Sequence, residues 1–157
     1  MTTVDIRLDH LAIAQRYAAD PQAWPVAPRF DAIDRWFHRL ADEADHEVWL
    51  LTWLPGQGTD LHDHGGSAGA FHVFSGSLVE DTVTVSPGSA PRITSRELGE
   101  GAGRRFGTHH IHRITNRSGR PAISIHAYGP ALTTMTRYRI AATGLDVVTV
   151  ERAGAQW

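Results

Sequence analysis

Cysteine and lysine are both absent from this chain of 157 residues. Without cysteine the chain can form no disulfide bond, and any thiol in its chemistry must come from a substrate. All fifteen basic residues are arginines, and they are scattered along the sequence rather than gathered on one predicted face. Together with the net charge of -2, this pattern gives nucleic-acid binding little support.

Long apolar runs and a secretory leader are also missing. No stretch approaches the roughly 18 apolar residues that a membrane-spanning helix requires, so we expect no membrane insertion. The start of the chain, Met1 to Arg7, lacks the basic segment followed by an apolar core that marks a secretory signal. The sequence therefore predicts a cytoplasmic protein.

Length and composition predict one globular domain over residues 1–157, with a core large enough to fold without disulfide bonds or other crosslinks. Within it, apolar residues recur at helical spacing only in the first third. Residues 8–19 predict an amphipathic helix that ends before Asp20-Pro21. A second helix is predicted to begin near Asp31, because Ile33, Phe37 and Leu40 share one helical face. We therefore expect residues 1–45 to be mainly helical.

From residue 46 to residue 151 the sequence changes to short β-prone runs separated by turn residues such as Pro55-Gly56 and Ser75-Gly76. The predicted strands cover residues 48–54, 70–74, 79–85, 93–98, 111–115, 122–128, 135–140 and 147–150. Strands at short intervals, with no helical pattern between them, favour an all-β antiparallel sandwich or barrel.

Three histidines indicate a metal site inside this β-rich region. His62 and His64 are two residues apart, so on a strand their imidazoles project from the same face and can bind one ion. His112 is the predicted third ligand, with the neighbouring His109 and His110 as alternatives. A site with three protein ligands and no carboxylate leaves coordination positions open for substrate, which is typical of catalytic rather than structural centres.

The glycines around these histidines have a spacing that resembles the cupin proteins. The residues that match the first cupin motif are Gly56, His62, His64, Gly69 and Gly76, and those that match the end of the second are His112 and Asn116. The resemblance implies a small antiparallel β-barrel or jelly roll with one or two N-terminal helices. Gly69 stands where the usual cupin has a glutamate ligand, which reduces the ligand set to three histidines.

From about residue 36 to residue 138 the sequence resembles the cysteine dioxygenase family, the thiol dioxygenase branch of the cupins. The segments that carry the resemblance are His62-Asp-His64, Gly76-Ser-Leu-Val-Glu80, His112-Arg-Ile-Thr-Asn116 and Pro121-Ala-Ile-Ser-Ile-His-Ala-Tyr-Gly-Pro130. The resemblance implies that the three histidines hold Fe2+. It also implies an oxidoreductase of cysteine catabolism that oxidises L-cysteine with O2 to cysteine sulfinate.

The same resemblance assigns Ser124, His126 and Tyr128 to a hydrogen-bonded relay. These residues alternate along the sequence, so on a strand all three side chains project from one face. A tyrosine hydroxyl held there can donate a hydrogen bond or proton beside an open metal site. Mammalian members of the family have a cysteine at the position of Gly69, which crosslinks to the tyrosine. This chain cannot form that link, and we expect Tyr128 to be a free phenol.

An arginine that follows an aromatic residue by two positions binds the substrate carboxylate in the family, and Phe37-His-Arg39 matches this pattern if the next hairpin is shortened. Arg39 is therefore the predicted substrate-binding residue, with Arg35, Arg105 and Arg113 as substitutes. In the related 3-mercaptopropionate dioxygenases the matching position resembles a glutamine. The resemblance with an arginine at this position therefore implies cysteine rather than 3-mercaptopropionate as the substrate. Two alternatives remain: a dioxygenase of another small thiol carboxylate, and a cupin that binds a metal or ligand as a sensor without catalysis.

Overall fold

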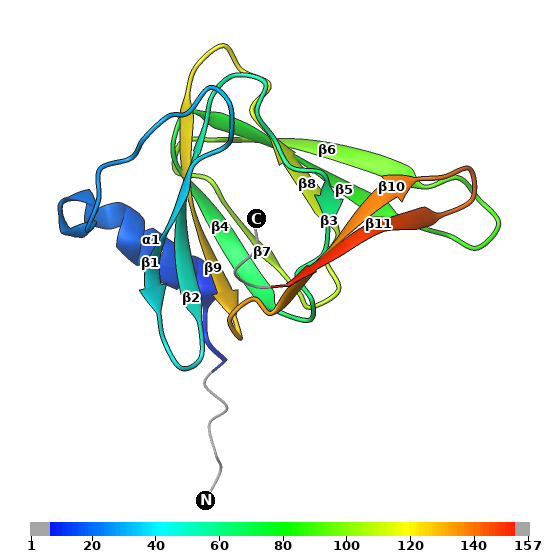
Figure 1. Cartoon of the computed structure of the whole chain (residues 1–157), viewed down its shortest axis with the longest axis horizontal. Helices are drawn as coiled ribbons and strands as arrows, with labels where there is room; N and C mark the ends of the chain where they lie inside the picture. Colours follow the sequence, from blue (N-terminus) through cyan, green and yellow to red (C-terminus); the bar gives the residue numbers. More distant parts are fainter. Residues whose placement is uncertain (1–6, 153–157) are drawn as a thin grey trace, which may run out of the picture.

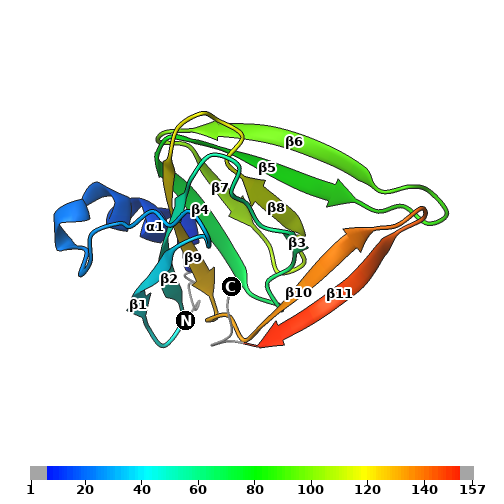
Figure 2. The same cartoon turned by 45° about the horizontal axis from the view of Figure 1, so that its top comes forward.

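Two antiparallel β-sheets that face each other form the body of the protein (Figures 1 and 2). The structure is a computed structural model, and it describes residues 7–152. The expectations about Met1 to Ile6 and about the last five residues of the predicted domain lie outside the described residues. None of the described helices is long and apolar enough to span a membrane.

The first sheet has five strands in the spatial order β1-β2-β9-β4-β7, and the second has six strands in the order β11-β10-β3-β8-β5-β6. The strands of the first sheet are β1 (Phe37–Asp42), β2 (Glu47–Trp53), β4 (Ala68–Ser75), β7 (Gly103–Phe106) and β9 (Ala122–Gly129). The strands of the second sheet are β3 (Leu61–His62), β5 (Ser77–Thr84), β6 (Arg92–Gly99), β8 (His112–Thr115), β10 (Thr134–Ile140) and β11 (Leu145–Arg152).

One α-helix, α1 (His10–Ala19), covers the outer face of the five-stranded sheet, and a short 3-10 helix, η1 (Pro21–Ala23), follows it. The side chain of Asp9 caps α1 by accepting hydrogen bonds from the backbone N–H groups of Leu11 and Ala12. Ile13 and Ala14 of the helix pack in one cluster with Val48, Leu50, Ile125 and Ala127 of the sheet. Because of this cover, β2 and β9 are buried on both faces.

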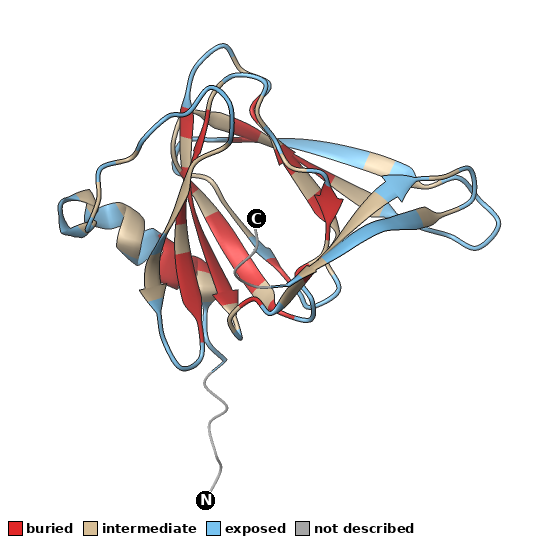
Figure 3. Cartoon of the chain, in the orientation of Figure 1, coloured by how far each residue is buried: buried red, intermediate tan, exposed pale blue. Residues whose placement is uncertain are grey.

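The inner faces of the two sheets enclose the larger core (Figure 3). On β2, Leu51 and Trp53 point into it, whereas their neighbours Val48 and Leu50 face the helix. Phe71 of β4 and Ile114 of β8 fill the space between the sheets. This alternation is the period of two that a strand dictates, and it places every second residue of β9 in the interior.

The eight strands predicted from the sequence are confirmed, each within two residues of its observed bounds. Strands β1, β3 and β7 were not predicted. The second helix predicted near Asp31 is wrong, because residues 37–42 form strand β1, which pairs with β2, and Ile33 is 89% exposed. The described part of residues 1–45 is consequently not mainly helical. The helical spacing of Phe37 and Leu40 arises instead from a strand with a bulge between Arg39 and Ala41.

Candidate metal centre and adjoining pocket

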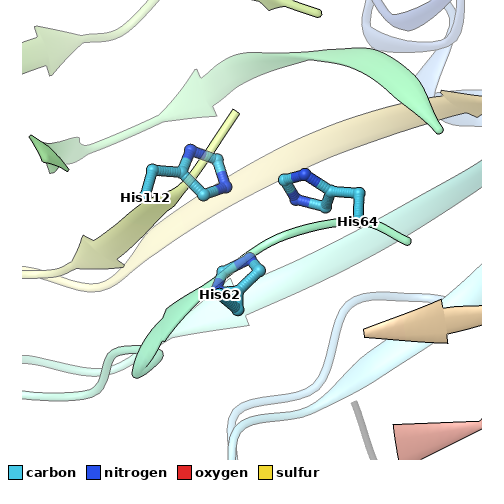
Figure 4. A group of neighbouring side chains, drawn as sticks. All are labelled: His62, His64 and His112. Carbon is cyan, nitrogen blue, oxygen red and sulfur yellow. The ribbon is translucent and has the colours of Figure 1, made fainter. Parts of the chain in front are cut away.

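Two neighbouring strands of the six-stranded sheet, β3 and β8, and the turn after β3 bring His62, His64 and His112 together in the interior (Figure 4). His62 ends β3 and lies directly opposite His112, the first residue of β8. His64 precedes a tight turn at Gly65 and Gly66, whose φ angles of 59° and 92° are unfavourable for other residues. One ring nitrogen of each histidine lies within 4.8 Å of the others, and all three side chains are buried.

The ring geometry fits a shared metal ion. If a metal lies about 2.1 Å from each coordinating nitrogen, and the nitrogen–metal–nitrogen angles are about 90–109°, the centroids of the imidazole rings are about 4.5 to 5.2 Å apart. The three observed centroid separations are 5.0 Å, 4.8 Å and 4.9 Å. Both ring nitrogens of His64 are buried and hydrogen-bond to no other group in residues 7–152. A metal ion could be the partner of one such buried nitrogen.

The protonation states also suit metal binding. Burial, which penalises the imidazolium form, lowers the pKa of His62, His64 and His112 below the ordinary histidine value, most strongly for the first two. At neutral pH all three rings are therefore neutral, as a ligating imidazole must be.

Two of the three rings are oriented by hydrogen bonds on the side away from the shared space. Nδ1 of His62 lies 2.8 Å from the backbone oxygen of Asp60, and Nδ1 of His112 lies 2.9 Å from Oε1 of Glu80. Both acceptors require a proton on Nδ1, which leaves the Nε2 lone pair of each ring free to coordinate.

Glu80, His110 and His112 form a second group of donor atoms close enough to hold a metal. In this group, however, the carboxylate already accepts hydrogen bonds. His110 Nε2 lies 2.8 Å from Oε1, and Arg104 Nε donates to Oε2 over 2.8 Å. Burial alone would raise the pKa of Glu80, but the two histidines and Arg104 hold it below the ordinary range. The group is therefore a satisfied hydrogen-bond network around an ionised carboxylate.

Ser124, His126 and Tyr128 form a continuous chain of hydrogen bonds on the inner face of β9. Trp53 Nε1 donates to Ser124 Oγ over 2.8 Å, Ser124 Oγ lies 2.8 Å from His126 Nε2, and His126 Nδ1 lies 3.2 Å from the Tyr128 hydroxyl. Burial keeps the pKa of His126 well below its ordinary value and raises the pKa of Tyr128 above that of a free phenol. Both side chains are thus neutral at physiological pH.

A pocket beside the histidines is lined by His62, His112 and Tyr128, by an apolar wall and by two arginines, Arg35 and Arg137. The guanidinium carbon of Arg35 lies 4.7 Å from the ring centroid of Trp53. Burial lowers the pKa of Arg35 to about 10, which still leaves it charged at neutral pH. Arg137 donates to both carboxylate oxygens of Glu151 over 2.9 Å and 3.1 Å. Apart from the histidines, the pocket is therefore lined by positive charge, by apolar surface and by the neutral side chains of Thr59 and Tyr128.

Arg39, which the sequence predicts to bind the substrate carboxylate, does not line this pocket. Its side chain is 47% exposed and pairs with Asp42 over 3.3 Å and with Glu47 over 3.9 Å. Among the substitutes, Arg105 pairs with Asp9, the N-cap residue of α1, and Arg113 pairs with Asp81. Only Arg35 of the four reaches the pocket, because it precedes β1 and its side chain turns inward.

Comparison with known proteins gives the relationship of the whole chain. Residues 2–140 match the family described as cysteine dioxygenase type I. The chain belongs to this family. Human cysteine dioxygenase type 1 is 28% identical over 133 residues, which cover 78% of this chain and 64% of the human protein. The rat protein of the same name is 25% identical over 132 residues. The chain therefore spans 64% of the length of these curated relatives.

Solved structures support the fold. The protein TT1209 from Thermus thermophilus superposes with a TM-score of 0.56 at 19% identity, over 66% of this chain and 90% of that one. A protein with a double-stranded β-helix domain from Klebsiella pneumoniae gives a TM-score of 0.52 at 17% identity, over 77% and 90% of the two chains. The predicted cupin fold, with one N-terminal α-helix, is confirmed.

At Gly69, the space beside the backbone is occupied by other parts of the chain. Gly69 pairs with Tyr128 on one side and with Phe106 on the other. A Cβ atom at residue 69 would lie 2.5 Å from the Ala127 carbonyl oxygen and 2.8 Å from Phe106 Cζ. The Phe106 ring therefore fills the space that a side chain at residue 69 would need.

Sequence reasoning missed three residues that complete the site. Glu80 lies in a segment that resembles the family, and a carboxylate on a predicted strand before a histidine motif is the signal that could have found it. Trp53, which anchors Ser124, and Arg137, which lines the pocket, come from distant parts of the chain. No local pattern marks either of them.

Proposed function

We propose that this protein is an iron(II)-dependent thiol dioxygenase that oxidises L-cysteine with O2 to cysteine sulfinate. The observation that carries the proposal is the convergence of three buried histidines, two of which, His62 and His112, also line a pocket that holds Tyr128 and Arg35. Membership of the cysteine dioxygenase type I family supports it. In the overall reaction both oxygen atoms of O2 are added to the sulfur, and the thiol becomes a sulfinic acid.

His62, His64 and His112 would hold the iron, and the donor set suits a divalent ion that must keep open positions. A ferrous ion would supply the redox chemistry that lets triplet O2 react with a thiol. Three neutral ligands leave the full charge of the ion uncompensated, which favours an anionic thiolate over a neutral thiol. The apolar wall of the pocket limits water at the reacting sulfur.

Arg35 would bind the substrate carboxylate. Its planar guanidinium can donate two parallel hydrogen bonds to the two carboxylate oxygens, and its stacking on Trp53 holds the group in place. Arg137 adds positive charge at the same pocket, although Glu151 partly compensates it. Because Arg35, His62 and His112 line the same pocket, a small carboxylate with a thiol a few bonds away would contact Arg35 at one end and the histidine centre at the other.

Tyr128 would direct a hydrogen bond toward the substrate or O2. Ser124 Oγ accepts a hydrogen bond from Trp53, and its own proton can go to Nε2 of His126. His126 then carries its proton on Nδ1 and donates it to the oxygen of Tyr128, so the phenolic proton is free to point into the pocket. In this arrangement the relay fixes the direction of the hydroxyl.

The test is oxygen consumption by the iron-loaded protein with L-cysteine, followed by mass spectrometry of the product. We expect isotopically labelled O2 to contribute both oxygen atoms of a sulfinate. Formation of cystine alone, or one labelled atom per product, would contradict dioxygenation. Iron-loaded protein that consumes no O2 with any small thiol would instead favour a ligand-binding sensor.

A second substrate, 3-mercaptopropionate, is favoured by one observation: no carboxylate is among the described residues that line the pocket. The amino group of cysteine therefore has no acidic partner there, and it would have to lose a proton and bind the metal as a neutral amine. Comparison of kcat/KM for the two thiols separates the candidates. A much larger value for 3-mercaptopropionate would overturn cysteine as the substrate while leaving the dioxygenase chemistry intact.

A further inference from the structure

The three histidines at the proposed metal centre are held in orientation by different means. His62 and His112 each use Nδ1 to hydrogen-bond to a fixed acceptor. His64 has no hydrogen bond to any other residue in the described part of the chain. Its ring instead stacks on the ring of Phe106, with centroids 4.6 Å apart and planes inclined by 21°. Tyr128 contacts the His64 ring as well, with centroids 5.3 Å apart, so the orientation of His64 depends on aromatic contacts, and the one with Phe106 is the closer and the more nearly parallel.

Phe106 also stacks on a second histidine, His110. His110 stacks on Phe106 with a centroid separation of 5.2 Å and an inclination of 14°. His110 Nε2 in turn hydrogen-bonds to the same oxygen of Glu80 that receives the bond from His112. A contiguous series of contacts therefore runs from His64 to His112 through Phe106, His110 and Glu80.

We propose that Phe106, His110 and Glu80, here called the ring clamp, are positioning residues that orient His64 and His112 and thereby tighten metal binding. The proposal rests on the proposed three-histidine centre. The three clamp residues would not themselves bind the ion, because Glu80 is fully engaged by His110, His112 and Arg104. Groups that orient ligating histidines in this way typically contribute 10- to 100-fold to metal affinity.

The chain offers a matched control for Glu80. Asp81 is the next residue on β5, it is equally buried, and it also accepts hydrogen bonds from arginines. Its partners are Ser95, Arg113 and Arg117, and no histidine is among them in the described residues. Glu80→Gln and Asp81→Asn therefore both remove a buried charge, but only the first alters the ring clamp.

The experiment is a titration of metal-free protein with Co2+, followed by calorimetry and by the visible absorption bands of the bound ion. We expect one Co2+ per chain for the wild type. The Kd should rise about 10- to 100-fold in Glu80→Gln and about 3- to 10-fold in Phe106→Leu, which loses the stacking but keeps most of the apolar volume. Asp81→Asn, and Leu98→Ala as a core truncation on β6, should bind Co2+ as the wild type does.

The possible failures are distinguishable. Absence of Co2+ binding by folded wild-type protein would overturn the metal centre and the clamp with it. Normal wild-type binding with unchanged Kd and absorption bands in both Glu80→Gln and Phe106→Leu would overturn the clamp alone. Two Co2+ per chain, or loss of the ion in His110→Gln, would make Glu80 or His110 a ligand and contradict the positioning role. Circular dichroism of each variant separates these results from misfolding, and Phe106→Leu tests the clamp independently if Glu80→Gln does not fold.

Discussion

At the scale of single residues, the ligands and the relay should respond differently to substitution. His112→Ala removes one of three ligands and should abolish retention of iron. Tyr128→Phe keeps the ring but removes the hydroxyl that the relay directs, so it should retain iron and lower kcat by about 100-fold or more. Iron analysis and oxygen consumption on the same samples measure both effects. Equal iron content in the wild type and in His112→Ala would show that another residue is the third ligand.

Arg35 and Arg39 provide a second comparison at this scale. Arg35→Gln removes the charge that faces the pocket, so KM for cysteine should rise about 10- to 100-fold with little change in kcat, as expected for a lost bidentate carboxylate contact. Arg39→Gln removes only half-exposed ion pairs and should change KM by less than about two-fold. Steady-state kinetics over a range of cysteine concentrations decide between them. A larger effect of Arg39→Gln would restore the assignment that sequence spacing favours.

At the scale of elements, the contribution of the α1 cap to the free energy of unfolding should depend on pH. Hydrogen bonds from Arg105 and from the backbone of the first helical turn lower the pKa of Asp9 from 3.8 to about 2. Because this pKa is lower in the folded state, the charge of Asp9 stabilises the fold above about pH 4, and that contribution is lost as the pH falls toward 2.

Asp9→Asn tests this dependence, since asparagine keeps the capping oxygen and removes the charge. The difference in the free energy of unfolding between the wild type and the variant should be present at about pH 6 and disappear toward pH 2. Urea denaturation at a series of pH values measures it. Because Asp9 is exposed, added salt should weaken the effect at neutral pH. A difference that does not vary with pH would show that the ion pair contributes nothing.

The helices and strands also differ in how well the sequence predicts them. The eight predicted strands have strong alternation or continuous apolar runs, and both patterns depend only on neighbours in sequence. Strand β3 is only Leu61–His62, and β7 is the charged segment Gly103–Phe106, so neither has enough apolar residues to reveal its period. The prediction of a second helix was wrong because the spacing of Phe37 and Leu40 fits both a helix and a bulged strand. Only the pairing with β2 shows that this segment is a strand.

At the scale of the whole molecule, metal binding should be linked to stability. The three histidines come from β3, its following turn and β8, so only the folded chain brings them together. Co2+ at about 100 times its Kd should therefore raise the free energy of unfolding by about 2.7 kcal/mol. Thermal unfolding with and without Co2+ tests this, and His112→Ala should show no such increase. An equal increase in His112→Ala would indicate binding elsewhere.

The candidate site could be predicted only in part, because some of its residues meet only when segments far apart in the sequence pack together. His62, His64 and His112 follow motif spacings, and Ser124, His126 and Tyr128 follow the period of one strand. The position of Arg35 against Trp53, and the meeting of Glu80 with His110, depend on how distant segments pack. The motif spacing favours Arg39, which follows Phe37 by two positions, whereas only the folded chain shows that Arg35 lines the pocket.

The two faces of strand β9 have different roles: one packs toward α1, and the other carries the relay. Its odd-numbered residues Ile125 and Ala127 pack toward α1, while Ser124, His126 and Tyr128 form the relay on the opposite side. A slip of one residue against β2 or β4 would exchange these two sets, burying polar rings under the helix and leaving aliphatic groups at the reaction site. The apolar contact between α1 and the outer face of β9 thus fixes the register that places the relay at the site. Mutations that weaken this contact should therefore lower kcat before they measurably lower the free energy of unfolding.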